Sequence, residues 1–223
     1  MPSYTISEIA SIVNGTLSNN LPDDYPIRHL LIDSRKVTSA DNALFFCLVT
    51  KKNNGHNYIP ELYEKGIRYF MVSSLPENQE NYANARFVLV SDTLVALQAL
   101  ATHNRLRFNI PVIGITGSNG KTIVKEWLFQ LLSPDKNIVR SPKSYNSQIG
   151  VPLSVWQMQP EHELAIFEAG ISEPEEMKLL QPIISPTIGI FTNIGTAHDK
   201  NFLNVRQKIG EKLNLFRRIE TLI

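Results

Sequence analysis

The residues best suited to chemistry lie in the stretch 111–122, which reads Pro-Val-Ile-Gly-Ile-Thr-Gly-Ser-Asn-Gly-Lys-Thr. Its apolar first half is typical of a strand that is buried on both faces of a parallel sheet. Gly117 and Gly120 let the backbone curl so that successive N–H groups point inward and can bind phosphate oxygens. Lys121 adds a positive charge, and Thr122 adds a hydroxyl that can bind Mg²⁺. The stretch therefore predicts a phosphate-binding loop.

A helix is predicted after this loop, because residues 123–132 carry apolar side chains at helical spacing. The loop then lies at a helix N-terminus, where the helix dipole favours bound anions. The strict phosphate-loop pattern requires glycine where Ile115 stands, and Gly114 comes one residue earlier. A Gly-Lys-Thr tripeptide alone is more often a chance turn. The predicted strand before it and helix after it favour the functional interpretation.

Polar side chains also follow three other predicted strands. Glu168 ends an apolar strand, where a carboxylate needs a partner such as a bound cation. The alternative is a structural pair between Glu168 and a lysine or a helix terminus. Asn193 and His198 follow a later strand, and Asn146 lies in a polar loop that opens a helix. Open α/β sheets bind ligands at the carboxyl ends of their strands, so we expect these residues near the phosphate loop.

Strands and helices alternate regularly after residue 109, which predicts a parallel sheet covered by helices. The expected order is strand 111–116, helix 121–132, strand 137–141, helix 149–158, strand 163–169, helix 174–181, strand 187–194 and helix 204–219. Earlier strands are shorter and more scattered, at 27–32, 43–49, 69–72 and 87–90. The predicted class is α/β, with a small mixed α/β N-terminal domain (1–108) followed by an incomplete doubly wound parallel sheet with a phosphate loop (109–223).

The first domain offers fewer candidates for binding. Asp33, Ser34 and Arg35 follow a predicted strand, and a solvated loop with an ion pair is the more frequent outcome of such a pattern. The alternative is that Ser34 and Arg35 bind a phosphorylated ligand at the strand end. Cys47 lies in an apolar run, so we expect it to pack rather than to react. His56 has no partner nucleophile in the pattern.

Composition excludes several classes of function. The chain has 223 residues, a formal net charge of +1 and a single cysteine. A balanced charge gives no reason to expect nucleic acid or an anionic membrane as partner. One cysteine excludes an intrachain disulfide and a multi-cysteine metal site. No apolar run reaches membrane-spanning length and no signal peptide pattern opens the chain, so we expect a cytoplasmic location.

Taken together, the motifs resemble those of the Mur ligase superfamily. They follow one another in family order, and the first domain is similar to the family's uridine-nucleotide domain. The matching segments are Thr116-Gly-Ser-Asn-Gly-Lys-Thr122, Val124-Lys-Glu126, Tyr145-Asn146, Ile149-Gly-Val-Pro-Leu153, Glu168-Ala-Gly170, Asn193-Ile-Gly-Thr-Ala-His198 and, earlier, Asp33-Ser-Arg35, Leu44-Phe45 and Gly55-His56. The Val-Lys-Glu segment favours the branch that adds D-alanyl-D-alanine to UDP-N-acetylmuramoyl-tripeptide.

The resemblance implies ATP-dependent amide formation in peptidoglycan precursor synthesis, with Mg²⁺ and an acyl phosphate intermediate. It implies catalytic roles for Lys121, Glu168, His198 and Lys212, and metal ligation by Thr122, Glu168 and His198. The implied nucleotide-binding residues are Thr116, Gly117, Ser118, Asn119, Gly120, Lys121, Thr122, Asn146 and Asn193. Ser34 and Arg35 would bind the UDP-linked substrate.

Lys212 is matched to a family lysine that is often carbamylated, which turns its ammonium group into an anionic oxygen ligand. Here Leu213 and Asn214 follow it, where Gly-Glu is usual in the family. The family's carbamylated lysine lies near a second magnesium ion, and the carbamylation state of Lys212 itself stays open.

Two other functions stay open at this point. A sibling ligase would keep the same ATP site and add another amino acid, or extend a folate-type tail. A regulatory paralogue would bind nucleotide without chemistry. Members of the family continue into a C-terminal domain that contacts the acceptor, and in some bacteria an alanine racemase domain follows. We therefore expect this chain to be a fragment that is inactive alone, of unknown oligomeric state.

Overall fold

The computed structural model describes residues 3–19, 25–37, 39–195, 199–217, 219 and 221–223. Contacts divide the chain into two compact units, residues 1–100 and 101–223. The division falls within helix α3 (Thr93–Arg105), somewhat before the boundary near residue 109 that the sequence suggests. Each unit has its own sheet, and each is described by itself.

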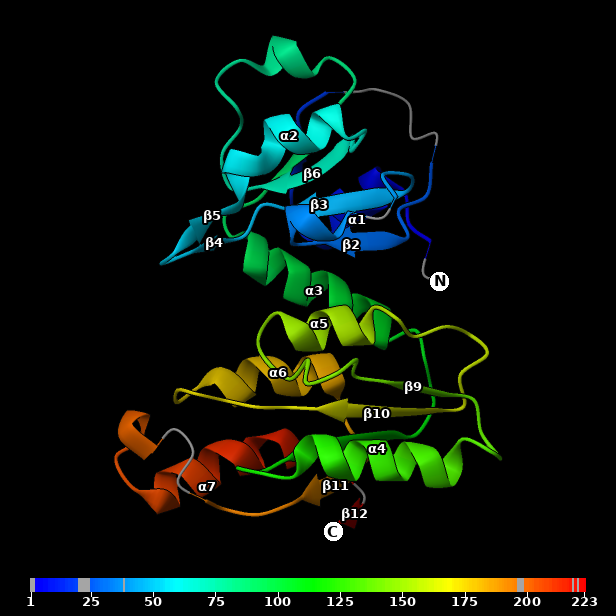
Figure 1. The fold of residues 1–223 in the computed structure, drawn as a ribbon, viewed down its shortest axis with the longest axis vertical. Helices are drawn as coiled ribbons and strands as arrows, with labels where there is room; N and C mark the ends of the chain where they lie inside the picture. The colour runs from blue at the N-terminus through cyan, green and yellow to red at the C-terminus, as the bar shows by residue number, and fades with distance from the viewer. Residues whose placement is uncertain (1–2, 20–24, 38, 196–198, 218, 220) are drawn as a thin grey trace. The chain divides into compact units, whose positions relative to one another are not determined.

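The first unit is built on a five-stranded sheet in the order β1-β7-β6-β3-β2, of which Figure 1 labels β6, β3 and β2. Its strands are β1 (Thr16–Leu17), β2 (His29–Leu31), β3 (Ala43–Phe46), β6 (Tyr69–Val72) and β7 (Arg86–Leu89). Strands β2, β3, β6 and β7 run parallel, and β1 is antiparallel to β7. The carboxyl ends of the four parallel strands therefore share one edge. Ser34 and Arg35 follow β2 at this edge.

The helices of this unit are α1 (Ile6–Ile12), α2 (Ile59–Glu64) and most of α3. A capping box begins α1, since Thr5 Oγ1 accepts from the Glu8 N–H and Glu8 Oε2 accepts from the Thr5 N–H. The core between helices and sheet contains stacked rings of Phe70 and Phe87, with centroids 5.4 Å apart. Cys47 is buried in the same core, and burial raises the pKa of its thiol, which agrees with a packing role.

The polar segment after Val49 is more regular than the sequence suggests. Strands β4 (Val49–Thr50) and β5 (Asn53–Asn54) form a hairpin, and a 3₁₀ turn (Gly55–Tyr58) follows it. His56 is held by both of its ring nitrogens, because Nδ1 lies 2.8 Å from Asn54 Oδ1 and Nε2 accepts from the Ser73 N–H at 3.0 Å. These two contacts tie the turn to the residue after β6, and burial lowers the pKa of His56.

The second unit contains a five-stranded sheet in the order β12-β11-β8-β10-β9, and every pair in it is parallel. Its strands are β8 (Val112–Thr116), β9 (Ile138–Arg140), β10 (Leu164–Glu168), β11 (Ile188–Phe191) and β12 (Thr221–Leu222). The register pairs Glu168 with Ile115 and Phe191 with Thr116. The central strand β8 and both of its neighbours therefore end at the same level.

Helices cover both faces of this sheet, as the alternating pattern predicts (Figure 1). The helices are α4 (Lys121–Leu132), α5 (Gly150–Val155), α6 (Glu176–Ile184) and α7 (Val205–Leu213). Side chains of α4 pack against Ile113, Ile115 and Ile166 on one face. Side chains of α5, α6 and the segment after α7 pack against the other. This is a doubly wound α/β sheet, and the predicted fold class is confirmed.

Helix α7 is shorter than the predicted helix 204–219. It ends at Leu213 and continues into a 3₁₀ turn, Asn214–Phe216. This tighter turn directs Leu215 and Phe216 into the core of the sheet, where both are buried. Packing thus overrides the local helical pattern.

In the described part of the chain, no helix combines the length and the apolar character needed to cross a membrane.

Candidate nucleotide-binding site

The predicted phosphate loop joins the end of β8 to the start of α4. Gly117 has φ +141° and Gly120 has φ +81°, backbone conformations that glycine adopts without strain. A Cβ atom at Gly117 would also lie 2.0 Å from Thr192 Oγ1, so the loop passes too close to the segment after β11 to allow any side chain there. The strand, glycine loop and helix predicted from the sequence are all present.

Asn193 holds the middle of this loop. The Ser118 N–H donates to the Asn193 backbone carbonyl at 2.9 Å, and the Asn119 N–H donates to Asn193 Oδ1 at 3.1 Å. The prediction that successive loop amides point toward a ligand is therefore wrong for these two in this structure. The amides of Lys121 and Thr122, at the start of α4, donate to no acceptor among the described residues. They are among the backbone donors that remain for an anion at the helix N-terminus.

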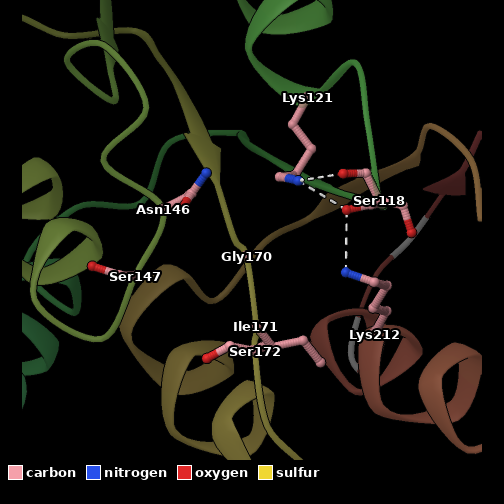
Figure 2. Close-up of a pocket in the computed structure, with 9 residues that line it drawn as sticks. Ser118, Lys121, Asn146, Ser147, Gly170, Ile171, Ser172 and Lys212 are labelled. Carbon is pink, nitrogen blue, oxygen red and sulfur yellow. Dashed lines mark hydrogen bonds between the residues drawn. The ribbon is translucent and has the colours of Figure 1, made fainter. Parts of the chain in front are cut away.

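A pocket of about 210 Å³ opens beside the loop and is lined by residues from four segments (Figure 2). These are Gly117, Ser118, Lys121, Asn146, Ser147, Gly170, Ile171, Ser172 and Lys212. Lys121 and Lys212 both donate to the Gly117 carbonyl, at 2.9 Å and 3.1 Å. Two ammonium groups therefore share one carbonyl oxygen, which leaves a local excess of positive charge facing the pocket. Such a surface suits phosphate groups.

The pKa values of two lysines at this pocket, Lys121 and Lys212, are lowered. Lys212 is buried, and burial, together with the charges of Lys121 and Lys208, lowers its pKa to about 8. Burial also lowers the pKa of Lys121, although the nearby Glu168 carboxylate opposes this shift. Lys208 is a further buried lysine on α7, and its Nζ donates to the Gly195 carbonyl at 2.5 Å. The sequence analysis did not identify Lys208.

The free energy of unfolding is expected to rise as the pH increases from about 8 toward 10.5, owing to Lys212. The folded chain releases this proton near pH 8 and the unfolded chain near 10.5, so between these values the unfolded chain binds more protons. The contribution is at most about 3 kcal/mol. Urea unfolding across this range, compared between the wild type and Lys212→Met, measures it. Equal pH dependence in the two proteins would contradict the assignment.

Glu168 lies at the end of β10 with its side chain fully buried. Its Oε2 atom accepts from the Thr122 hydroxyl at 3.0 Å and from Asn146 Nδ2 at 3.4 Å. Its backbone N–H donates to Ser141 Oγ at 3.1 Å. Thr122, Asn146 and Glu168, which the sequence analysis placed at separate strand ends and loops, therefore meet beside the phosphate loop.

Lys125 is the partner of Glu168 that the sequence analysis left without a role. Its Nζ atom lies 2.9 Å from Glu168 Oε1, and both side chains are fully buried. The pairing of Glu168 with a lysine, raised above as an alternative to a bound cation, is what the structure shows. A signal for it exists in the sequence, because Lys125 shares the sheet-facing side of α4 with Leu128 and Leu132. A lysine on an apolar helix face and a glutamate in an apolar strand are candidates for mutual burial.

Divalent metal binding depends on the oxygen atoms near Thr122. Glu168 Oε1 is buried and accepts no hydrogen bond with good geometry, despite its ionic contact with Lys125. A carboxylate and a hydroxyl beside phosphate donors fit Mg²⁺, which takes few protein ligands and completes its shell with water and phosphate oxygens. Among the described residues, no three His, Cys, Asp or Glu side chains converge on a metal position. His198, the third expected ligand, lies outside the described residues.

Thr116 has a structural role in this arrangement. Its side chain is fully buried, and Oγ1 donates to the Ala169 carbonyl at 2.8 Å. This hydrogen bond connects β8 to the segment after β10, so the Thr116 side chain does not face the pocket.

A second hollow of about 240 Å³ lies over the start of α4. Six of the expected nucleotide-binding residues line it: Ser118, Asn119, Gly120, Lys121, Thr122 and Asn146.

Ser34 and Arg35 belong to the first unit. Arg35 forms two hydrogen bonds with Asp33, at 2.8 Å and 2.9 Å, while most of its side chain is exposed. The hydrogen bond from Arg35 lowers the pKa of Asp33 to about 2. Ser34 is buried in a 3₁₀ turn after β2. The expected ion pair is therefore present. Binding of a phosphorylated ligand by Ser34 and Arg35 stays a prediction.

A parallel sheet whose central strand ends in a glycine loop, with a lysine opening the next helix, defines a phosphate-loop nucleotide-binding protein. Comparison with known sequences narrows this class. A model described as Mur ligase family, catalytic domain matches residues 26–105, and a model of the Mur ligase middle domain matches residues 115–222. The chain belongs to the Mur ligase family and carries its N-terminal and middle domains.

The relatives include enzymes named UDP-N-acetylmuramoyl-tripeptide–D-alanyl-D-alanine ligase. The one from Synechocystis sp. is 40% identical over 80% of this chain and 38% of its own length. The one from Bacillus subtilis is 34% identical over 95% of this chain and 45% of its own length. The chain thus spans less than half the length of these relatives.

Solved structures of proteins named MurF share the fold of this chain. MurF from Acinetobacter baumannii matches with a TM-score of 0.88 and 27% identity, over 98% of this chain and 47% of its own. MurF ligase from Thermotoga maritima, solved in complex with ADP, matches with a TM-score of 0.75 and 26% identity, over 86% of this chain and 44% of its own.

Proposed function

We propose that this protein is an ATP-dependent ligase that joins D-alanyl-D-alanine to UDP-N-acetylmuramoyl-tripeptide in peptidoglycan precursor synthesis. The observation that carries this proposal is the meeting of Lys121, Thr122 and Glu168 at one sheet edge, in a chain of the Mur ligase family. The names of its relatives supply the substrates. Because ATP and a UDP-linked precursor are the co-substrates, we place the reaction in the cytoplasm.

In this reaction a carboxylate oxygen of the peptide attacks the γ-phosphorus of ATP, and ADP leaves. The amine of D-alanyl-D-alanine then attacks the resulting acyl phosphate, and inorganic phosphate leaves. Charge spreads over the phosphoryl oxygens during the first step, so positioned cations accelerate it. In this proposal Lys121 exchanges the Gly117 carbonyl for these oxygens, and the backbone amides of Lys121 and Thr122 at the start of α4 add two further donors.

Mg²⁺, when bound, would neutralise phosphate charge, and Thr122 and Glu168 are the described residues that would hold it. The Thr122 hydroxyl donates to Glu168 Oε2, so its oxygen lone pairs remain free to bind a cation. Lys212 adds positive charge beside Lys121, because both donate to the Gly117 carbonyl. We also propose that the exposed guanidinium of Arg35, with Ser34, binds the UDP-linked substrate at the edge of the first sheet.

Residues 1–223 are proposed to bind ATP without complete ligase turnover. The relatives are more than twice as long as the part that this chain matches. An acyl phosphate must be shielded from water until the amine attacks it, and domain closure commonly provides that shield. The pocket beside the phosphate loop, lined by Lys121, Asn146 and Lys212 among others, would need such a cover.

The test pairs ATP binding with phosphate release. Calorimetry should show ATP binding to this chain in the presence of Mg²⁺. In a release assay with the tripeptide substrate, the Bacillus subtilis relative serves as positive control, and D-alanine and L-lysine serve as alternative acceptors. Release by this chain at the rate of the relative would contradict the proposed need for further segments. Release stimulated by another amino acid would favour a sibling ligase, and absence of ATP binding would overturn the proposal.

A further inference from the structure

Lys125 is fully enclosed, with no exposed surface, although it is charged and lies close to the phosphate loop. Its Nζ atom donates to the Ser141 carbonyl at 2.7 Å and to the Lys143 carbonyl. It also makes ionic contacts with Glu168 Oε1 at 2.9 Å and Glu126 Oε1 at 3.1 Å. A buried ammonium group persists only when it is paired in this way, so the surrounding groups define one position for it.

These contacts join three segments that each supply one group to the candidate site. Helix α4 carries Lys125 and, one turn earlier, Thr122. Strand β10 ends in Glu168, and the segment whose carbonyls bind Lys125 leads directly to Asn146. The ammonium group of Lys125 therefore links the three segments that carry Thr122, Glu168 and Asn146, and so helps to fix the positions of these residues.

The two oxygen atoms of the Glu168 carboxylate have different neighbours. Oε1 faces Lys125, while Oε2 faces the Thr122 hydroxyl and the Asn146 amide. A quarter-turn of the carboxylate would separate both oxygen atoms from these partners and leave the buried ammonium group without its counter-charge. Lys125 thus fixes the orientation of the carboxylate plane, which directs one oxygen atom toward Thr122 and Asn146.

We propose that Lys125 is a positioning residue for the metal-dependent part of nucleotide binding, acting through Glu168 and Asn146 without touching the nucleotide. This inference rests on the proposed function, because it concerns the same ATP site. Lys125 is enclosed by protein groups and contributes to neither hollow beside the loop. Removing it should therefore leave the direct phosphate contacts of Lys121 in place. What it should change is the arrangement of Thr122, Glu168 and Asn146.

The experiment measures ATP affinity by calorimetry twice, in excess Mg²⁺ and in EDTA, and takes the ratio as the Mg²⁺-dependent gain. Lys125→Met, which keeps the length of the side chain, should reduce this gain by about tenfold, as loss of an outer partner of a metal ligand commonly does. Affinity in EDTA should change by less than about threefold, because the ammonium group of Lys125 bonds to Ser141, Lys143 and two carboxylates and not to Lys121 or the loop carbonyls. A purely structural role would lower both affinities together.

Two further variants keep the test informative. Glu126→Gln removes the other carboxylate beside Lys125 without altering Glu168, and its Mg²⁺-dependent gain should match the wild type. If Lys125→Met is too unstable for the titrations, the double variant Lys125→Met/Glu168→Gln removes the unpaired charge and should be the more stable of the two. Its melting temperature should exceed that of Lys125→Met alone. Failure of Glu168→Gln to restore stability would show that Lys125 does not act through Glu168.

An unchanged Mg²⁺-dependent gain in folded Lys125→Met would overturn the inference while leaving ATP binding, and so the proposed function, intact. Absence of ATP binding or of any Mg²⁺ effect in the wild type would instead overturn the proposed function. The two failures are therefore distinguishable in one set of titrations.

Discussion

Replacing Lys121 with alanine is expected to weaken ATP binding by about a hundredfold, the effect of losing two charge-assisted hydrogen bonds to phosphate. Among the described residues, its ammonium group donates to the carbonyls of Gly117 and Ser118. The fold does not depend on these contacts, because Lys212 also donates to Gly117. The free energy of unfolding should therefore change by less than about 1 kcal/mol. Calorimetry for ATP and urea unfolding measure the two quantities.

The matched control for this change is Lys136→Ala. Lys136 is an exposed lysine shortly after the same helix, 4.0 Å from the exposed Glu163. It should leave both ATP affinity and stability unchanged, because exposed ion pairs contribute little. Unchanged ATP affinity in folded Lys121→Ala would show that the phosphate loop is assigned wrongly.

Replacing Glu168 with alanine is expected to destabilise the protein by about 3 to 5 kcal/mol, the usual result of leaving one member of a buried ion pair without its partner. Lys125 would keep its two carbonyl acceptors but lose its fully buried counter-charge. The Thr122 hydroxyl and the Asn146 amide would lose their shared acceptor as well. Chemical denaturation followed by circular dichroism measures the loss.

Glu163→Ala provides the comparison for this second change. Glu163 directly precedes the same strand and pairs with a lysine at the surface, where both side chains are about half exposed. Its loss should cost less than about 1 kcal/mol. Similar destabilisation in the two variants would mean that burial of the Glu168 pair adds nothing to stability.

The phosphate loop could be predicted from the sequence because its determinants are local. The apolar run before Gly117, the glycines themselves and the helical spacing after Lys121 all lie within about two dozen residues. The alternation of strands and helices likewise predicted the parallel sheet, since each element is specified by its own pattern. The early end of α7 was missed, because burial of Leu215 and Phe216 depends on the sheet they pack against.

The contacts between distant segments could not be predicted in the same way. Asn193 accepts hydrogen bonds from the amides of Ser118 and Asn119 because the register of β11 beside β8 brings it next to the loop. The pair between Lys125 and Glu168 depends on how α4 lies across β10. Asn193 and Glu168 could each be selected from the sequence as polar residues at strand ends. Strand order and register, which the sequence does not show directly, decide which residues they contact.

The central position of β8 has a consequence for the order in which this unit folds. Its partners come much later in the chain, since Thr116 bonds to Ala169 and Val112 bonds to Thr187, 53 and 75 positions away. The chain must close long loops before either pairing forms, which makes such parallel sheets slow to fold. The phosphate loop reaches its final shape only once β11 is in place. A nucleotide would then bind the assembled sheet alone, and would lengthen the lifetime of the folded state rather than hasten its formation.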